Sequence, residues 1–189
     1  MKSSRFLLSM TLLLIATAAV AQQHEMQTSA SQPQSDAQKS FSELKALAGT
    51  WTGPVTLDPP VPELAKEPLW VTMRVTSRGN AVVHEFKKPG TPDDVTKDDP
   101  VTTFYVDNDR LTLVHYCDAG NRPRMVARPS TDGKTVEFDF VDVSGSTAMG
   151  NMYHAVFTTI DANHHTEDWV YMMPGNKPMH AHADLTRVQ

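Results

Sequence analysis

The chain has 189 residues, 22 acidic and 17 basic side chains, a formal net charge of -5 and one cysteine. The negative charge argues against nucleic acid or an anionic membrane as a partner. A single cysteine cannot form a disulfide within the chain.

Residues 1–21 have the layout of a secretory signal peptide. Lys2 and Arg5 form a basic start, an apolar run follows, and residues 19–21 (Ala-Val-Ala) supply the small side chains that a signal peptidase needs. The apolar run is short for a membrane-spanning helix, which needs about 20 residues. We therefore expect a periplasmic or secreted protein that begins at Gln22 and has no stable membrane insertion.

Residues 22–39 are polar and rich in glutamine and serine, which predicts a disordered linker. We expect the folded domain over residues 40–189, beginning with a short helix. Ser40 can cap this helix, and Glu43 completes a capping box. Its apolar residues lie at helical spacing: Phe41, Leu44 and Leu47.

Ten segments with β-strand composition follow, separated by Gly-, Asn- and Asp-rich turn signals. They cover residues 50–57, 69–77, 80–87, 101–107, 110–117, 122–129, 135–141, 152–160, 165–173 and 180–188. Short strands joined in sequence predict an all-β fold, a single antiparallel up-and-down β-barrel of about ten strands. A two-sheet sandwich is the competing architecture.

The stretch LKALAGTWTG, residues 44–53, resembles the entry to calycin barrels, the group of lipocalins and fatty-acid-binding proteins. In those families a short helix leads into a G-x-W strand, and a basic residue of the last strand covers the tryptophan at the closed end. Gly49 and Trp51 match this motif, and Arg187 stands where the basic partner is expected. A guanidinium over an indole is favourable by about 0.5–2 kcal/mol. The resemblance implies a structural role for these three residues.

Two further resemblances concern other segments. HYCDAGNRPRM, residues 115–125, is similar to the signature of uncharacterised exported bacterial proteins of the same layout, which implies the fold and export but no activity. Residues 49–53 also resemble the G-T-W-x-G opening of nitrobindins, although Val55 replaces a glycine that is usual there. Nitrobindins hold haem through a histidine on the last strand, which implies His180 or His182 as the ligand.

The segment LTLVHYC, residues 111–117, contains the only cysteine. Alternate residues of a strand share a face, so His115 and Cys117 point the same way, about 6–7 Å apart along the strand. That separation is too long for a thiol–imidazole hydrogen bond. We expect Cys117 to be a buried packing residue at a hairpin. We expect His115 to line the interior, hydrogen-bonded to a tyrosine or an arginine.

Other polar residues have two interpretations each. Arg122, Arg124 and Arg128 share a strand face; they form a solvated stripe unless Arg124 points inward and needs a carboxylate. His180 and His182 form an H-x-H spacing that can bind a metal, or they are simply exposed imidazoles.

The acidic residues of the strands are interpreted as solvated. Glu137 and Asp139 alternate with apolar residues, which indicates an outward-facing pair. The doublet Glu167–Asp168 is interpreted as a solvated rim rather than as acid–base machinery. The sequence contains no phosphate loop, nucleophile elbow or nucleotide fingerprint, so we expect no catalytic residues.

These features predict an exported, non-catalytic protein without a cofactor, which binds a small, largely apolar ligand in its barrel. The ligand-binding residues are expected to include His115, Tyr116, Arg124 and His154. The alternative is a barrel that binds haem or a metal through His180 or His182. An enzyme that uses the barrel pocket is a third hypothesis.

Overall fold

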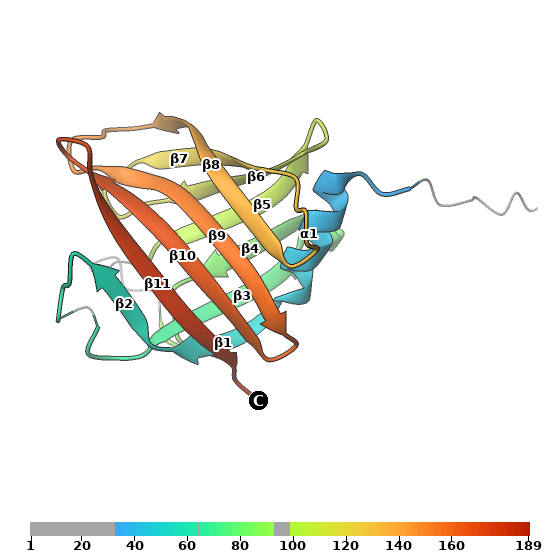
Figure 1. Cartoon of the computed structure of the whole chain (residues 1–189), viewed down its shortest axis with the longest axis horizontal. Helices are drawn as coiled ribbons and strands as arrows, with labels where there is room; N and C mark the ends of the chain where they lie inside the picture. The colour runs from blue at the N-terminus through green and yellow to red at the C-terminus, as the bar shows by residue number, and fades with distance from the viewer. Residues whose placement is uncertain (1–32, 64, 93–98) are drawn as a thin grey trace, which may run out of the picture. The chain divides into compact units, whose positions relative to one another are not determined.

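The computed structural model describes residues 33–63, 65–92 and 99–189 (Figure 1). The chain divides into residues 1–32 and the compact unit Pro33–Gln189, and only the second is described. The expected signal peptide and most of the expected linker therefore lie outside the described residues. Within the described part, no helix is long and apolar enough to cross a membrane.

The helix α1 (Asp36–Ala46) begins five residues earlier than the capping box indicated, so the end of the expected linker is helical. Ser35 caps it by accepting a hydrogen bond from the Gln38 backbone N–H at 3.3 Å. Ser40 is buried within the helix instead of capping it. The predicted apolar face is confirmed, because Phe41, Leu44 and Leu47 are all buried.

All ten predicted strand segments form strands, and the first is split in two. The strands of the described residues are β1 (Gly49–Gly53), β2 (Val55–Asp58), β3 (Leu69–Thr76), β4 (Ala81–Glu85), β5 (Val101–Asp107), β6 (Arg110–Tyr116), β7 (Arg122–Ala127), β8 (Thr135–Ser144), β9 (Asn151–Asp161), β10 (His164–Met173) and β11 (Lys177–Arg187). A 3-10 turn, η1 (Ser77–Gly79), joins β3 to β4. Pro54 separates β1 from β2 because proline has no N–H for the strand ladder.

The strands close into an antiparallel barrel (Figure 1). Neighbours from β3 to β11 pair in chain order, and β1 pairs with both β3 and β11. Trp51 is opposite Val71 on one side and Arg187 on the other. The strand β2 continues along β11, with Leu57 opposite Ala181. The fold is therefore the predicted all-β, ten-stranded up-and-down barrel and not the competing sandwich.

The two ends of the barrel differ in how they are filled. The helix α1 lies against one end, beside β5, β6 and β8, and its apolar residues join the core around Trp51. At the opposite end, the inward-facing apolar side chains are only half-buried. We call this group the rim; it consists of Leu69, Phe86, Met152 and Ala181. The candidate site lies between this rim and the closed end.

Candidate functional site

A carboxylate inside the barrel gathers three N–H donors. Glu167 is fully buried, and its two oxygens lie 3.2 Å and 3.0 Å from Nε2 of His84. Nε2 of His165 lies 3.1 Å from one of these oxygens, and Nε1 of Trp169 donates to the other at 3.0 Å. Because a carboxylate only accepts hydrogen bonds, both Nε2 atoms carry a hydrogen. We call these four residues the Glu167 network.

Strand alternation places this network inside. His165, Glu167 and Trp169 are the buried members of β10, whereas the side chain of Asp168 between them is half-exposed. Glu167 is opposite Phe157 on β9 and opposite Ala183 on β11, and both are buried core residues. The interpretation of the Glu167–Asp168 doublet as solvated is therefore right for Asp168 and wrong for Glu167. Adjacent residues of a strand face opposite sides, so the two cannot share an environment.

Glu167 is ionised despite its burial. Desolvation opposes its charge, but attraction to His84 and hydrogen bonds from His165 and His84 outweigh it. Together they hold the pKa of Glu167 below its ordinary value. A buried carboxylate needs partners for its oxygens, and the network supplies three N–H donors.

Two ring nitrogens of the network lack a hydrogen-bond partner in the described part of the chain. Nδ1 of His84 and Nδ1 of His165 are buried and unpaired among the described residues. A buried polar atom without a partner costs about 1–3 kcal/mol. His84 lies below the rim, with its ring centroid 4.7 Å from that of Phe86. His165 lies towards the closed end, with its ring edge against Trp51 at 4.2 Å.

His115 lies inside the barrel, as strand alternation indicated. Its Nδ1 is 2.8 Å from Oγ1 of Thr102, the residue directly opposite on β5. The expected hydrogen-bond partner was a tyrosine or an arginine. The partner is instead Thr102, because the residue directly opposite on the neighbouring strand lies within hydrogen-bond distance of the ring. The His115 ring centroid is 5.6 Å from that of Trp169. Burial, followed by repulsion from His84, lowers the pKa of His115 to about 3, so the ring is neutral at neutral pH.

This shift predicts acid sensitivity. The pKa of His115 is about 3 in the folded protein and about 6.5 when unfolded, so only the unfolded state binds a proton between these values. The stability that neutral His115 provides is complete above pH 6.5 and declines as the pH falls, by about 2 kcal/mol at pH 5. Urea unfolding at pH 7 and pH 5 measures this loss. The loss should largely disappear in His115→Gln and persist in the control His154→Gln; an unchanged loss in His115→Gln would contradict the assignment.

The closed end has the geometry expected of a calycin entry. Trp51 is fully buried, and its Nε1 donates to the Leu47 carbonyl at 2.8 Å. The guanidinium carbon of Arg187 lies 4.0 Å from the centroid of the Trp51 ring. The same guanidinium donates to three backbone carbonyls, those of Ala46, Ala48 and Ala162. Gly49 has a φ of +144°, which favours glycine, and a Cβ there would lie 2.4 Å from the guanidinium.

Three of the four expected ligand-binding residues do not face the interior. Tyr116 is 49% exposed and alternates with buried His115. Arg124 alternates with buried Met125 and pairs outside the barrel with Asp142, whose Oδ1 accepts from Arg124 Nε at 3.1 Å. The structure therefore brings neither residue together with His115, and Arg124 belongs to the solvated alternative.

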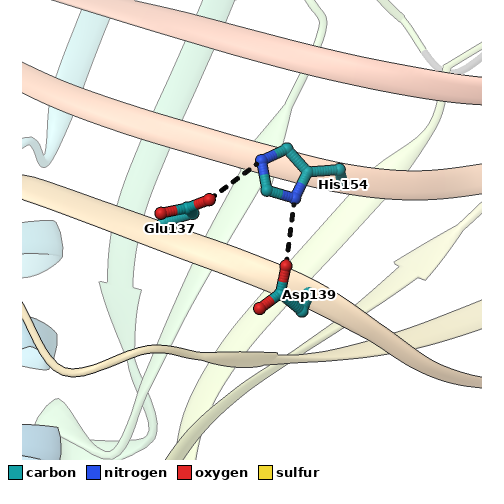
Figure 2. Close-up of side chains that lie close together, drawn as sticks. All are labelled: Glu137, Asp139 and His154. Atoms are coloured by element: carbon teal, nitrogen blue, oxygen red, sulfur yellow. Dashed lines mark ion pairs between the residues drawn. The ribbon is translucent and has the colours of Figure 1, made fainter.

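His154, the fourth, lies outside between two carboxylates (Figure 2). Its Nε2 is 3.5 Å from Glu137 and its Nδ1 is 3.4 Å from Asp139, which confirms that this acidic pair faces outward. These groups are close enough to hold a metal ion. However, Arg128 lies 3.1 Å from the Glu137 carboxylate and donates to both oxygens of Asp139. We interpret the cluster as an ion-pair network.

The remaining candidates also lie away from the network. Cys117 is half-buried at the β6–β7 turn, where its N–H donates to the Asn121 carbonyl at 3.0 Å, so it is less buried than expected. His180 and His182 alternate with Ala181 and Ala183 and face outward. Neither imidazole fits the role of a haem ligand inside the barrel.

Comparisons with known proteins support the fold. No protein-family model matches this chain, and no curated protein matches it. The chain is similar to the crystal structure of Rv2717c from M. tuberculosis, with 14% identity and a TM-score of 0.54, over 79% of this chain and 97% of that one. It also matches a protein of unknown function from the DUF3598 family of Nostoc punctiforme PCC 73102, with 8% identity and a TM-score of 0.46. That match covers 77% of this chain and 49% of the other.

Proposed function

We propose that this protein is an exported, non-catalytic binding protein that holds a small, largely apolar ligand inside its barrel, below the rim. The observation that carries the proposal is the buried imidazole of His84 beneath an apolar rim, with its Nδ1 unpaired among the described residues. Ligand sites combine apolar walls with a few polar groups that fix orientation. The rim supplies the walls and the network supplies the polar groups.

The arrangement favours a ligand with an apolar body and one polar end. Phe86 of the rim and Trp169 of the network have ring centroids 5.8 Å apart, and both rings flank His84. An apolar body would pack against these aromatic rings. A hydroxyl or carboxyl end suits the His84 imidazole, because Nδ1 accepts a hydrogen bond when neutral and donates one when protonated.

The electrostatics support binding rather than catalysis. A carboxylate with a lowered pKa and three N–H donors, as in Glu167, is a poor general base near neutral pH. His115 is neutral, because its pKa is lowered, and it is hydrogen-bonded to Thr102. The protons on Nε2 of His84, Nε2 of His165 and Nε1 of Trp169 are therefore held in hydrogen bonds to Glu167.

A variant that fills the rim tests the proposal. Ala181→Trp places an indole at a half-buried inward position, whereas His180→Trp places the same side chain outside on the same strand. The probe is 1-anilinonaphthalene-8-sulfonate, displaced by alkyl carboxylates and alcohols of increasing length. We expect saturable binding to the native protein and to His180→Trp, and at least a tenfold loss in Ala181→Trp, about 1.4 kcal/mol. Equal affinity in the two variants would place the probe elsewhere and contradict an interior site.

A further inference from the structure

We propose that the outer face of β2, β10 and β11 carries a second site, which binds a divalent transition-metal ion such as Zn²⁺ through His180, His182 and Asp58. A groove of about 230 Å³ lies there. Its lining includes all three residues and Asp168. This site lies on the opposite face of the sheet from the Glu167 network and does not depend on the proposed ligand.

The strand register brings the candidate ligands together. His180 and His182 are two residues apart on β11, so both imidazoles project from the same face. Asp58 of β2 is directly opposite His180, and Asp168 of β10 is directly opposite His182. Opposite residues in antiparallel strands have Cβ atoms about 4.5–5.5 Å apart. Two imidazoles and two carboxylates therefore surround one small area of the surface.

One hydrogen bond already orients a candidate metal-binding side chain, that of His182. Nδ1 of His182 lies 2.6 Å from Oδ1 of Asp168. This bond occupies Nδ1 and leaves Nε2 as the metal-binding atom, the arrangement in which a carboxylate orients a metal-bound histidine. Asp168 is therefore a positioning residue. His182, His180 and Asp58 provide an N₂O donor set, which suits Zn²⁺ with water in the fourth position.

The charge around the groove also favours a cation. The described residues that line it include two aspartates and no lysine or arginine. In the cluster of Figure 2, by contrast, Arg128 already neutralises Glu137 and Asp139. The donor atoms in that cluster lie within 4.8 Å of one another, whereas those at the groove are not gathered so closely. Binding therefore requires a rotation of exposed side chains, and His180, His182 and Asp58 are all exposed.

Calorimetric titration of the chelator-treated mature protein with ZnCl₂ at pH 7.5 tests this site. We expect saturable binding that His180→Ala and His182→Ala each weaken at least tenfold. Asp168→Asn should weaken it about 10–100-fold, because it removes the orienting carboxylate. The matched control is His164→Ala: His164 forms the same kind of outward pair, 2.6 Å from Asp184, but does not line the groove.

Substitution with Co²⁺ provides a second readout. The native protein should show visible absorption typical of nitrogen-ligated Co²⁺, and His180→Ala should lose it while keeping its melting temperature. Zn²⁺ binding that survives in both His180→Ala and His182→Ala would overturn the proposal. An absence of Zn²⁺ binding by the native protein would overturn it as well.

Discussion

Replacement of Glu167 by alanine is expected to lower the free energy of unfolding by about 3–5 kcal/mol, the usual effect of breaking a buried ion pair. The carboxylate accepts hydrogen bonds from His84, His165 and Trp169, and it is fully buried. Its removal leaves three buried donors without an acceptor and any imidazolium without its counter-charge. Urea unfolding monitored by far-UV circular dichroism measures the loss.

The neighbouring residue provides the control for this prediction. Asp168→Ala removes a carboxylate from the same strand, but that carboxylate is 47% exposed and paired with a half-exposed His182. Exposed pairs contribute about 0–1 kcal/mol, so the loss should be small. Glu167→Gln should fall between the two, because it keeps an acceptor for Trp169 and removes the charge. If Glu167→Ala lowered the free energy of unfolding no more than Asp168→Ala, the Glu167 network would not stabilise the fold as described.

Replacement of Trp51 by alanine should cost a similar amount, about 3–5 kcal/mol, because it leaves a cavity in a closed core. The Trp51 indole is fully buried. It donates a hydrogen bond to the Leu47 carbonyl and packs beneath Arg187 and beside His165. The change would also remove one hydrogen bond at the C-terminal end of α1. Thermal and urea unfolding at neutral pH measure the effect.

Trp70 is a matched control for Trp51. It also lies under a cation, with Lys88 Nζ 5.0 Å from its ring centroid, but it is only half-buried and faces outward on β3. Trp70→Ala should therefore cost clearly less than Trp51→Ala. A similar cost for both would mean that burial at the closed end is not what makes Trp51 important.

The elements of the fold were largely predictable because local signals specify them. Alternation between turn signals identified all ten strand segments, and G-x-W placed Trp51 at the closed end. The start of α1 was missed because the sequence offers two serines, Ser35 and Ser40, that can cap the helix. Only the burial of Ser40 in the folded protein shows that Ser35 is the cap. The split of the first strand was signalled by Pro54, a residue without a ladder donor.

The interior network was not predictable in the same way. His84 and Glu167 are 83 residues apart, and only barrel closure brings their side chains together. A partial signal existed, because His165, Glu167 and Trp169 lie two residues apart and so share one strand face. A glutamate that shares a face with two large rings could have been recognised as inward-facing. Sequence alone also did not place Arg124 and His154, whose chemistry suggested a ligand site. Their alternation with buried Met125 and Ala155 places them outside.

Native mass spectrometry of the protein purified from the organism that makes it tests the central claim most directly. The native protein should carry one small molecule, with the polypeptide mass that begins at Gln22. Ala181→Trp, prepared in the same way, should have the mass of the polypeptide alone, whereas His180→Trp should keep the adduct. A native protein without any bound molecule, or an adduct retained in Ala181→Trp, would contradict ligand binding inside the barrel.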